Sequence, residues 1–186
     1  MKLLSIFFVL ITFHTMAAQD NVVVNKQRLS AQIVQEFQTY YGIAMQNGDY
    51  WYDKYSGAWG YTGGPAIGLL LPGMNLGGEL QVNASNGNTS VFINGRELHL
   101  MDVLGLQQLI GPVLPGRYWL DGYGNAGYEG GPALVNLWQL AQNSQASQGS
   151  QGGSTFYRNS YTGIGAGSSG GTSYVMGKDW SVIVGN

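Results

Sequence analysis

The chain of 186 residues is long enough for one domain or for two small ones. Only 10% of its residues are charged, whereas about 25% is typical of soluble proteins. Its 8 Lys and Arg residues stand against 10 Asp and Glu and form no basic cluster. Phosphate backbones and anionic membrane surfaces are bound by clustered positive charge, so this composition argues against nucleic acid as a partner.

The N-terminal segment has the pattern of a secretory signal peptide. A positive residue, Lys2, precedes an apolar run from Leu3 to Phe13, and small residues follow at Ala17 and Ala18. The run is shorter than the roughly 20 residues of a membrane-spanning helix, so no membrane span is expected. The chain has no cysteine and therefore no disulfide framework. We expect a signal peptide over residues 1–18 and a protein exported to the periplasm or the medium.

Two segments of the chain are copies of one another. Residues Tyr50–Ala66 recur as Tyr118–Ala133, with eleven of sixteen aligned positions identical when Trp59 is skipped. Each copy is an aromatic run, a turn, a second aromatic run and then Gly-Gly-Pro, which predicts a β-hairpin.

A helix is predicted upstream of each hairpin. Over Leu29–Gly42 the apolar residues fall on one helical face, Ser30 is placed to cap the N-terminus, and Gly42 is placed to end the helix. The second copy is Leu100–Gly111, where Asp102 in the first turn suits the helix dipole. Each unit is therefore expected to be a helix, a short loop and an aromatic hairpin.

Further elements are expected between and after the units. Asn94-Gly95 predicts a type I′ turn in a hairpin over Val91–Leu98. Pro132 is placed to begin a short helix. A Gln/Ser/Gly tract at 143–154 is typical of a linker, and a C-terminal hairpin is expected within 155–186. The prediction is an α+β fold: two duplicated helix-plus-hairpin units around one core in a domain over 19–142, followed by the linker and the terminal hairpin.

The duplicated motifs resemble those of a family of exported bacterial proteins of uncharacterised function. The resemblance rests on Tyr50-Trp51-Tyr52-Asp53, Ser56-Gly57, Trp59-Gly60, Gly63-Gly64-Pro65 and Asn94-Gly95-Arg96-Glu97-Leu98. It implies no activity, cofactor or catalytic residue. The hairpins also resemble, more loosely, the aromatic and glycine repeats of choline-binding and glucan-binding modules.

Some of the aromatic residues are candidate ligand-binding residues, because flat rings can stack on sugar rings. About half of each strand must face the core, so a structural role is the competing interpretation. Trp59, absent from the second copy in the alignment above, is the strongest candidate, and Glu129 replaces Thr62 of the first copy. The candidate ligand-binding set is Trp59, Tyr61, Tyr123, Tyr128 and Glu129.

Catalytic chemistry has little support in the sequence. Asp53 and Asp121 precede the two turns, where an Asp usually accepts backbone hydrogen bonds. His99 is the one histidine after the predicted signal peptide, too few for an ordinary zinc site. No P-loop is present. We expect no catalytic residue, no metal and no cofactor.

These observations favour an exported, non-catalytic structural or binding protein of the bacterial envelope or surface, with envelope glycan or another envelope protein as its partner. One alternative is a secreted hydrolase acting on polysaccharide or peptidoglycan. A second is a protein-partner or self-assembly module that uses the terminal hairpin as an exposed edge.

Overall fold

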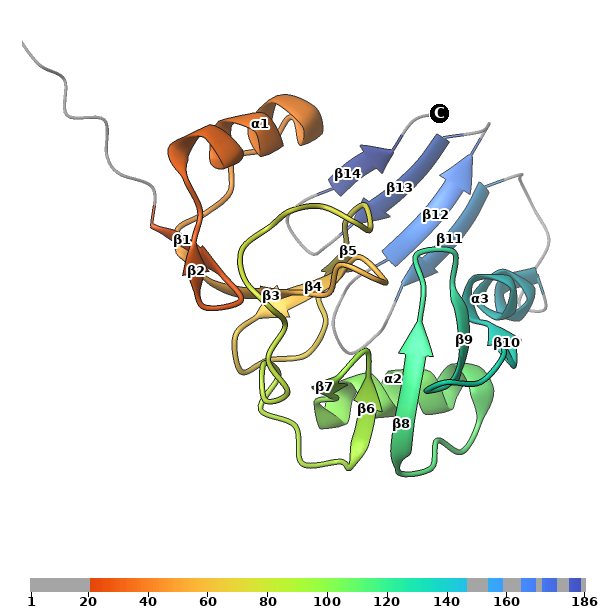
Figure 1. Cartoon of the computed structure of the whole chain (residues 1–186). Helices are drawn as coiled ribbons and strands as arrows, with labels where there is room; N and C mark the ends of the chain where they lie inside the picture. Colours follow the sequence, from red (N-terminus) through yellow and green to blue (C-terminus); the bar gives the residue numbers. More distant parts are fainter. Residues whose placement is uncertain (1–20, 147–153, 159–164, 170–171, 177–180, 185–186) are drawn as a thin grey trace, which may run out of the picture.

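The computed structural model describes residues 21–146 and four strands nearer the C-terminus, with side chains described as far as residue 143 (Figure 1). The predicted signal peptide over residues 1–18 and most of the predicted linker lie outside the described residues. Two five-stranded sheets, a four-stranded sheet and three helices make up the described part. The mixed α+β class is thereby confirmed.

The first unit (residues 22–69) is a five-stranded sheet with one helix. Its order is β2-β1-β3-β4-β5, and helix α1 (Ala31–Tyr41) connects the first hairpin to β3. Strands β1 and β3 pair in parallel, and the other neighbours pair antiparallel. The strands are β1 (Val22–Val24), β2 (Gln27–Arg28), β3 (Gly48–Tyr52), β4 (Ala58–Tyr61) and β5 (Gly68–Leu69).

The second unit (residues 91–136) repeats this plan with the same strand order, β7-β6-β8-β9-β10. Helix α2 (Leu100–Ile110) again connects the first hairpin to the strand that pairs with it in parallel. The strands are β6 (Val91–Ile93), β7 (Arg96–Glu97), β8 (Gly116–Leu120), β9 (Asn125–Tyr128) and β10 (Val135–Asn136). The duplication is therefore longer than its sequence signal, because the Asn-Gly hairpin opens the second unit and has a counterpart in β1 and β2.

The third helix begins later than predicted. Helix α3 is Leu137–Ala146, whereas residues after Pro132 are extended and include β10. The Leu134 backbone N–H bonds to the Ala126 carbonyl in the adjacent strand, which holds this segment out of a helix. Beyond α3, a four-stranded antiparallel sheet contains the predicted terminal hairpin as its last two strands. Its strands are β11 (Ser154–Arg158), β12 (Gly165–Ser169), β13 (Thr172–Met176) and β14 (Ser181–Val184).

The capping residues explain where the two duplicated helices begin and end. Ser30 caps α1 by accepting a hydrogen bond from the Ile33 N–H, and Gly42 ends the helix with a left-handed φ of 69°. His99 takes the place of Ser30 in the second unit, where its Nδ1 accepts from the Met101 N–H at 3.1 Å. The histidine is thus a helix cap.

The strand register corrects the alignment of the two hairpins. Tyr52 pairs with Trp59, and Leu120 pairs with Ala126. Ala126 is therefore the counterpart of Trp59, and the additional residue of the first copy lies in the turn after Asp53. The inference that Trp59 has no counterpart in the second copy was wrong.

The buried side chains form three clusters rather than one core. In the first unit Val22, Leu29 and Val34 join α1 to the sheet, and Val91, Leu98 and Val103 hold the equivalent positions in the second unit. Burying each such side chain contributes about 1.5–3 kcal/mol. The middle cluster contains Trp51, Ala58 and Ala84. No helix among the described residues is long and apolar enough to cross a membrane.

Candidate functional site

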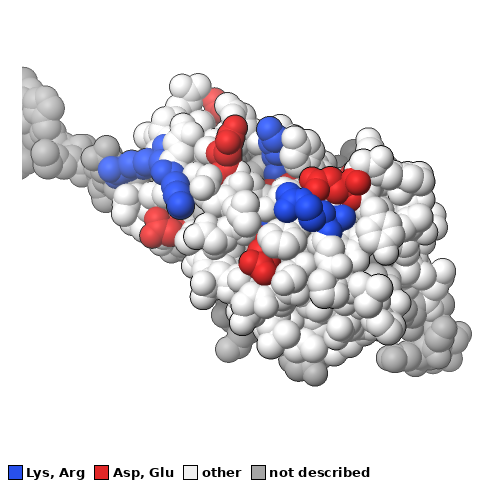
Figure 2. Space-filling view, turned by 60° about the horizontal axis from the view of Figure 1, so that its bottom comes forward, with Lys and Arg blue, Asp and Glu red and all other residues white. Residues whose placement is uncertain are grey.

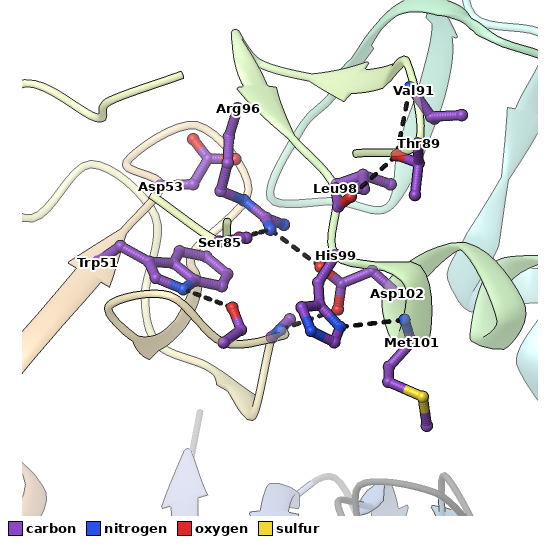
Figure 3. Close-up of polar contacts among 12 residues, drawn as sticks. Trp51, Asp53, Ser85, Thr89, Val91, Arg96, Leu98, His99, Met101 and Asp102 are labelled. Carbon is purple, nitrogen blue, oxygen red and sulfur yellow. Dashed lines mark hydrogen bonds and ion pairs between the residues drawn. The ribbon is translucent and has the colours of Figure 1, made fainter. Parts of the chain in front are cut away.

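The contact between the two units is built on one arginine and one tryptophan. Arg96 comes from β7 of the second unit, and its guanidinium carbon lies 3.9 Å from the centroid of the Trp51 ring of the first unit (Figure 3). Arg96 is 5% exposed and Trp51 is 1% exposed. A desolvated cation on an indole face is worth about 2 kcal/mol or more, so this is a strong link between the units.

The guanidinium is neutralised by an acid from the start of α2. Arg96 Nη1 donates to Asp102 Oδ2 at 2.9 Å and also to the Ser85 hydroxyl. The other oxygen of Asp102 accepts the Ala66 backbone N–H at 2.8 Å. Asp102 therefore connects Arg96 of its own unit to the loop that follows the first aromatic hairpin.

Trp51 also packs against the backbone of the neighbouring strand. A Cβ added to Gly60 would lie 2.8 Å from Cζ2 of Trp51 and would clash with the Pro65 carbonyl, so only glycine fits there. The indole Nε1–H donates to the Gly64 carbonyl at 3.1 Å. The glycine at position 60 is thus explained by the need to hold a flat ring against a bare strand, and the Gly64 carbonyl fixes the indole N–H.

A second polar contact joins the units beside the first. The Asn94 amide donates to Asp53 Oδ2 at 2.6 Å and to the Leu120 carbonyl at 2.7 Å, and its oxygen accepts from the Leu120 N–H. Asp53 is 3% exposed and also accepts from the Tyr55 N–H and the Ser56 hydroxyl. The predicted turn-capping role of Asp53 is confirmed, and the same carboxylate serves the interface.

Asp121 caps the equivalent turn of the second unit. It accepts from the Tyr123 N–H, the Asn125 N–H and the Asn125 amide, each at 2.9 Å. Desolvation, the largest single influence, raises the pKa of Asp121, but the hydrogen bonds from Asn125, Tyr123 and Gly124 together lower it below its usual 3.8. A carboxyl with a lowered pKa is ionised, and an ionised carboxylate can accept the hydrogen bonds of a turn cap. A general acid would instead need to hold a proton. No group of three or more His, Cys, Asp and Glu residues in the described part of the chain is placed to hold a metal ion.

The second unit repeats the tryptophan but not the arginine on it. Trp119 Nε1–H donates to the Gly131 carbonyl at 3.0 Å, and a Cβ added to Gly127 would lie 3.0 Å from Trp119 Nε1. These are the contacts of Trp51 at equivalent positions. Trp119 is nevertheless only half-buried, and no described cation stacks on its ring.

The predicted ligand-binding residues do not form a single constellation. Tyr61 and Tyr128 hold equivalent exposed positions and stack on Tyr50 and Tyr118, with ring centroids 5.1 and 5.0 Å apart. Trp59 packs, partly buried, against the core of the first unit.

Tyr123 is 81% exposed in its turn, and Glu129 forms an exposed ion pair with Arg117 at 2.6 Å. A ligand-binding role for these five residues stays a prediction.

The sequence analysis missed Arg96 and the pairing role of Asp102, although they replace Gln27 and Ile33 of the first unit. That difference between the copies was the available signal.

The surface of the molecule carries few charges. In the view of Figure 2 the Lys, Arg, Asp and Glu side chains form small groups separated by wide uncharged areas. Large apolar side chains are exposed on the second unit at Leu114, Tyr123, Tyr128 and Leu134, each more than half exposed. The face drawn in Figure 2 is therefore not strongly charged and would not steer a charged partner toward the protein.

The chain is similar to two plant proteins over about half of its length. It is 43% identical over 88 residues to Extra-large guanine nucleotide-binding protein 1 of Arabidopsis thaliana, covering 46% of this chain and 10% of that protein. It is 33% identical over 97 residues to Extra-large guanine nucleotide-binding protein 2 of the same plant, covering 50% and 11%. The chain therefore spans about a tenth of the length of these relatives. No protein-family model matches the chain, and no solved structure matches it.

These similarities overturn the predicted placement among exported bacterial proteins. The relatives are plant guanine nucleotide-binding proteins, so an exported envelope protein, in the periplasm or the medium, with a glycan or envelope partner was the wrong interpretation. The hydrolase and self-assembly alternatives gain no support either. The reason is physical: Asp53, Asn94, Gly95 and Arg96 cap turns and join units, so their motifs mark a fold and not a cellular location.

Proposed function

We propose that the two-unit domain is a protein-recognition module of a kind that larger guanine nucleotide-binding signalling proteins also carry, and that it binds a protein partner rather than the nucleotide. The observation that carries the proposal is the extent of the similarity. About half of this chain corresponds to about a tenth of each relative, which is the relation expected of a part that recurs in proteins of different overall construction.

The site chemistry supports a partner over a nucleotide. A guanine nucleotide needs a glycine-rich phosphate loop with a lysine, or an equivalent nest of backbone N–H groups. The sequence has no P-loop, and the carboxylates Asp53, Asp102 and Asp121 are occupied as caps or ion-pair partners. All three carboxylates stabilise the fold through these contacts, so none of the three is free to bind magnesium.

The exposed aromatic and aliphatic side chains of the second unit supply the surface. Tyr123 and Leu134 both stay more than half exposed. Tyrosine is enriched at recognition surfaces because its rigid ring offers contact area at little entropic cost. Tyr55 holds the position of Tyr123 in the first unit and is also exposed, which gives a matched control.

The test compares partner capture by three versions of the full chain. The wild type, the Tyr123→Ser/Leu134→Ser variant and the Tyr55→Ser control are used for quantitative affinity enrichment from cells that express the chain. A protein retained by wild type and control but lost by the double variant is then purified and titrated against all three. We expect the double variant to lose at least about tenfold in affinity, the effect of 1.4 kcal/mol.

A parallel titration with a fluorescent GTP analogue, with and without Mg²⁺, tests the competing function. We expect no saturable binding. Saturable, stoichiometric nucleotide binding, or equal partner binding by the double variant, contradicts the proposal.

A further inference from the structure

The contact between the units is directional, because the two sides contribute different groups. The first unit provides what we call the arginine socket: the Trp51 ring and the Ala66 N–H. The second unit provides the groups that fill it, Arg96 and, six residues later, Asp102. The socket of one unit thus receives an arginine and an acid from the next (Figure 3).

The second unit has its own copy of the socket. Trp119 and Ala133 hold the positions of Trp51 and Ala66, and Gly127 and Gly131 repeat the supporting contacts of Gly60 and Gly64. Ala133 is exposed, and its N–H donates no hydrogen bond within the described part of the chain. Trp119 is half-buried where Trp51 is 1% exposed. Both recognition groups of this second socket are therefore accessible.

The groups needed to fill it are not available from another copy of the same domain. The first unit has Gln27 and Ile33 at the positions of Arg96 and Asp102, so it brings neither the cation nor the acid. Arg96 of a second molecule is already buried in its own socket. Neither the first unit nor a second copy of the domain therefore supplies the occupant.

We propose that Trp119 and the Ala133 N–H form a docking site for a protein partner that presents an arginine at a β-turn hairpin and an acidic residue six positions later. This inference rests on the proposed partner-binding function and names the chemistry of the partner. The arginine stacks on Trp119, and the acid accepts the Ala133 N–H while neutralising the arginine. The occupied first socket of the same molecule is the template for each contact.

The test uses a synthetic peptide with the sequence of residues 91–103, closed into a hairpin and checked by NMR to be folded. It is titrated into the full chain beside two matched peptides, one with Arg96→Gln, the residue of the first unit, and one with Asp102→Asn. Because only the peptides differ, the fold of the protein is the same in every titration. We expect the Arg96→Gln peptide to bind at least about tenfold more weakly, as loss of a desolvated cation–π contact implies.

The ring of Trp119 supplies a signature specific to stacking. The peptide's arginine side-chain protons should shift upfield on binding, and the Trp119→Leu variant of the full chain should abolish that shift. The Ala133→Pro variant of the full chain removes the N–H and keeps Trp119. It should lower the affinity for the peptide with Arg96 and Asp102, and lower the affinity for the Asp102→Asn peptide by a smaller factor.

The peptide titrations overturn the proposal if the folded Arg peptide does not bind, if the Arg and Gln peptides bind equally, or if the upfield shift survives Trp119→Leu. The full chain with Arg158→Gln tests whether the chain's own C-terminal part occupies the socket. Tighter peptide binding by that variant assigns the socket to the chain itself and also overturns the proposal. If the peptide shows no binding while affinity enrichment still yields a protein that the Tyr123→Ser/Leu134→Ser variant no longer retains, the proposed function stands and only this inference is contradicted.

Discussion

The guanidinium of Arg96 covers the ring of Trp51, 45 positions earlier in the chain, at 3.9 Å from the ring centroid. The two residues belong to different units of the duplication, so the cation that lies on Trp51 comes from the second unit. Stability of the first unit is therefore predicted to depend on a side chain of the second.

Replacing Arg96 by Gln should destabilise the domain by about 3–5 kcal/mol, because Asp102 would be left as a buried charge without its cation. Gln27→Ala at the equivalent exposed position should change the free energy of unfolding by less than about 0.5 kcal/mol. Urea denaturation of the full chain measures both. A loss below about 1 kcal/mol for Arg96→Gln would mean that the buried ion pair contributes little net stability.

The glycines beneath the two tryptophans should be intolerant of even one methyl group. Gly60→Ala and Gly127→Ala should each cost about 1–3 kcal/mol or more, since the new Cβ would press on the Pro65 or Pro132 carbonyl and on the indole. Gly64→Ala is the control, because its Cβ would meet a single atom at an ordinary 3.4 Å. Thermal melts compare the three. Equal melting temperatures for Gly60→Ala and Gly64→Ala would show that the strand can move away from the ring.

The first hairpins of the two units should respond in opposite directions to exchange of their turn residues. Lys26 has φ 64° and its counterpart Gly95 has φ 85°, both in the left-handed region. That conformation costs a side-chain-bearing residue about 1–2 kcal/mol, so Lys26→Gly should stabilise the domain and Gly95→Lys should destabilise it by about 1 kcal/mol. Chemical denaturation gives the sign of each. The prediction fails if both substitutions change stability in the same direction.

Alkaline pH should weaken the domain through Tyr52. Burial, the largest influence, raises the pKa of Tyr52 from 10.0 to about 12, with the nearby Tyr41 and Asp53 adding to the rise and a hydrogen bond from the Met74 backbone opposing it. Because the folded pKa is the higher one, the stabilisation is fully present below pH 10 and is lost as the pH rises toward 12.

Unfolding free energies measured between pH 8 and 12 should therefore fall more steeply for the wild type than for Tyr52→Phe. The variant also loses the hydroxyl contacts with the Leu71 carbonyl and the Met74 N–H, so it should be less stable than the wild type at pH 8. Parallel pH profiles for the two proteins would contradict the assignment of the effect to Tyr52.

Local signals in the sequence were sufficient for the two duplicated helices and for the turn at Asn94 and Gly95. Ser30 and Gly42 bound α1 as capping chemistry predicts, and Asn94 and Gly95 both adopt positive φ, as a type I′ turn requires. The counterpart turn at Asn25 and Lys26 escaped prediction because lysine is an unusual residue for that conformation. The full extent of the duplication was missed with it.

The candidate site could not be predicted in the same way. The local sequence predicts only that Arg96 is a strand residue after a turn. The tertiary structure shows that its side chain contacts the other unit and lies on the Trp51 ring. Trp59 was singled out from an alignment that placed the additional residue in the strand, whereas the turn after Asp53 absorbs it. Contacts between units depend on how the duplicated sheets pack, which neither copy encodes alone.

The direction of the Arg96 contact also sets an order for synthesis on the ribosome. About fifty residues must follow Trp51 before Asp102 is made, which takes a few seconds at roughly 5–20 residues per second. Throughout that interval the nascent first unit carries an uncovered indole face that its own strands cannot shield. The growing chain is thus most exposed to chaperones, and to premature association, between the completion of its first hairpin pair and the emergence of its second.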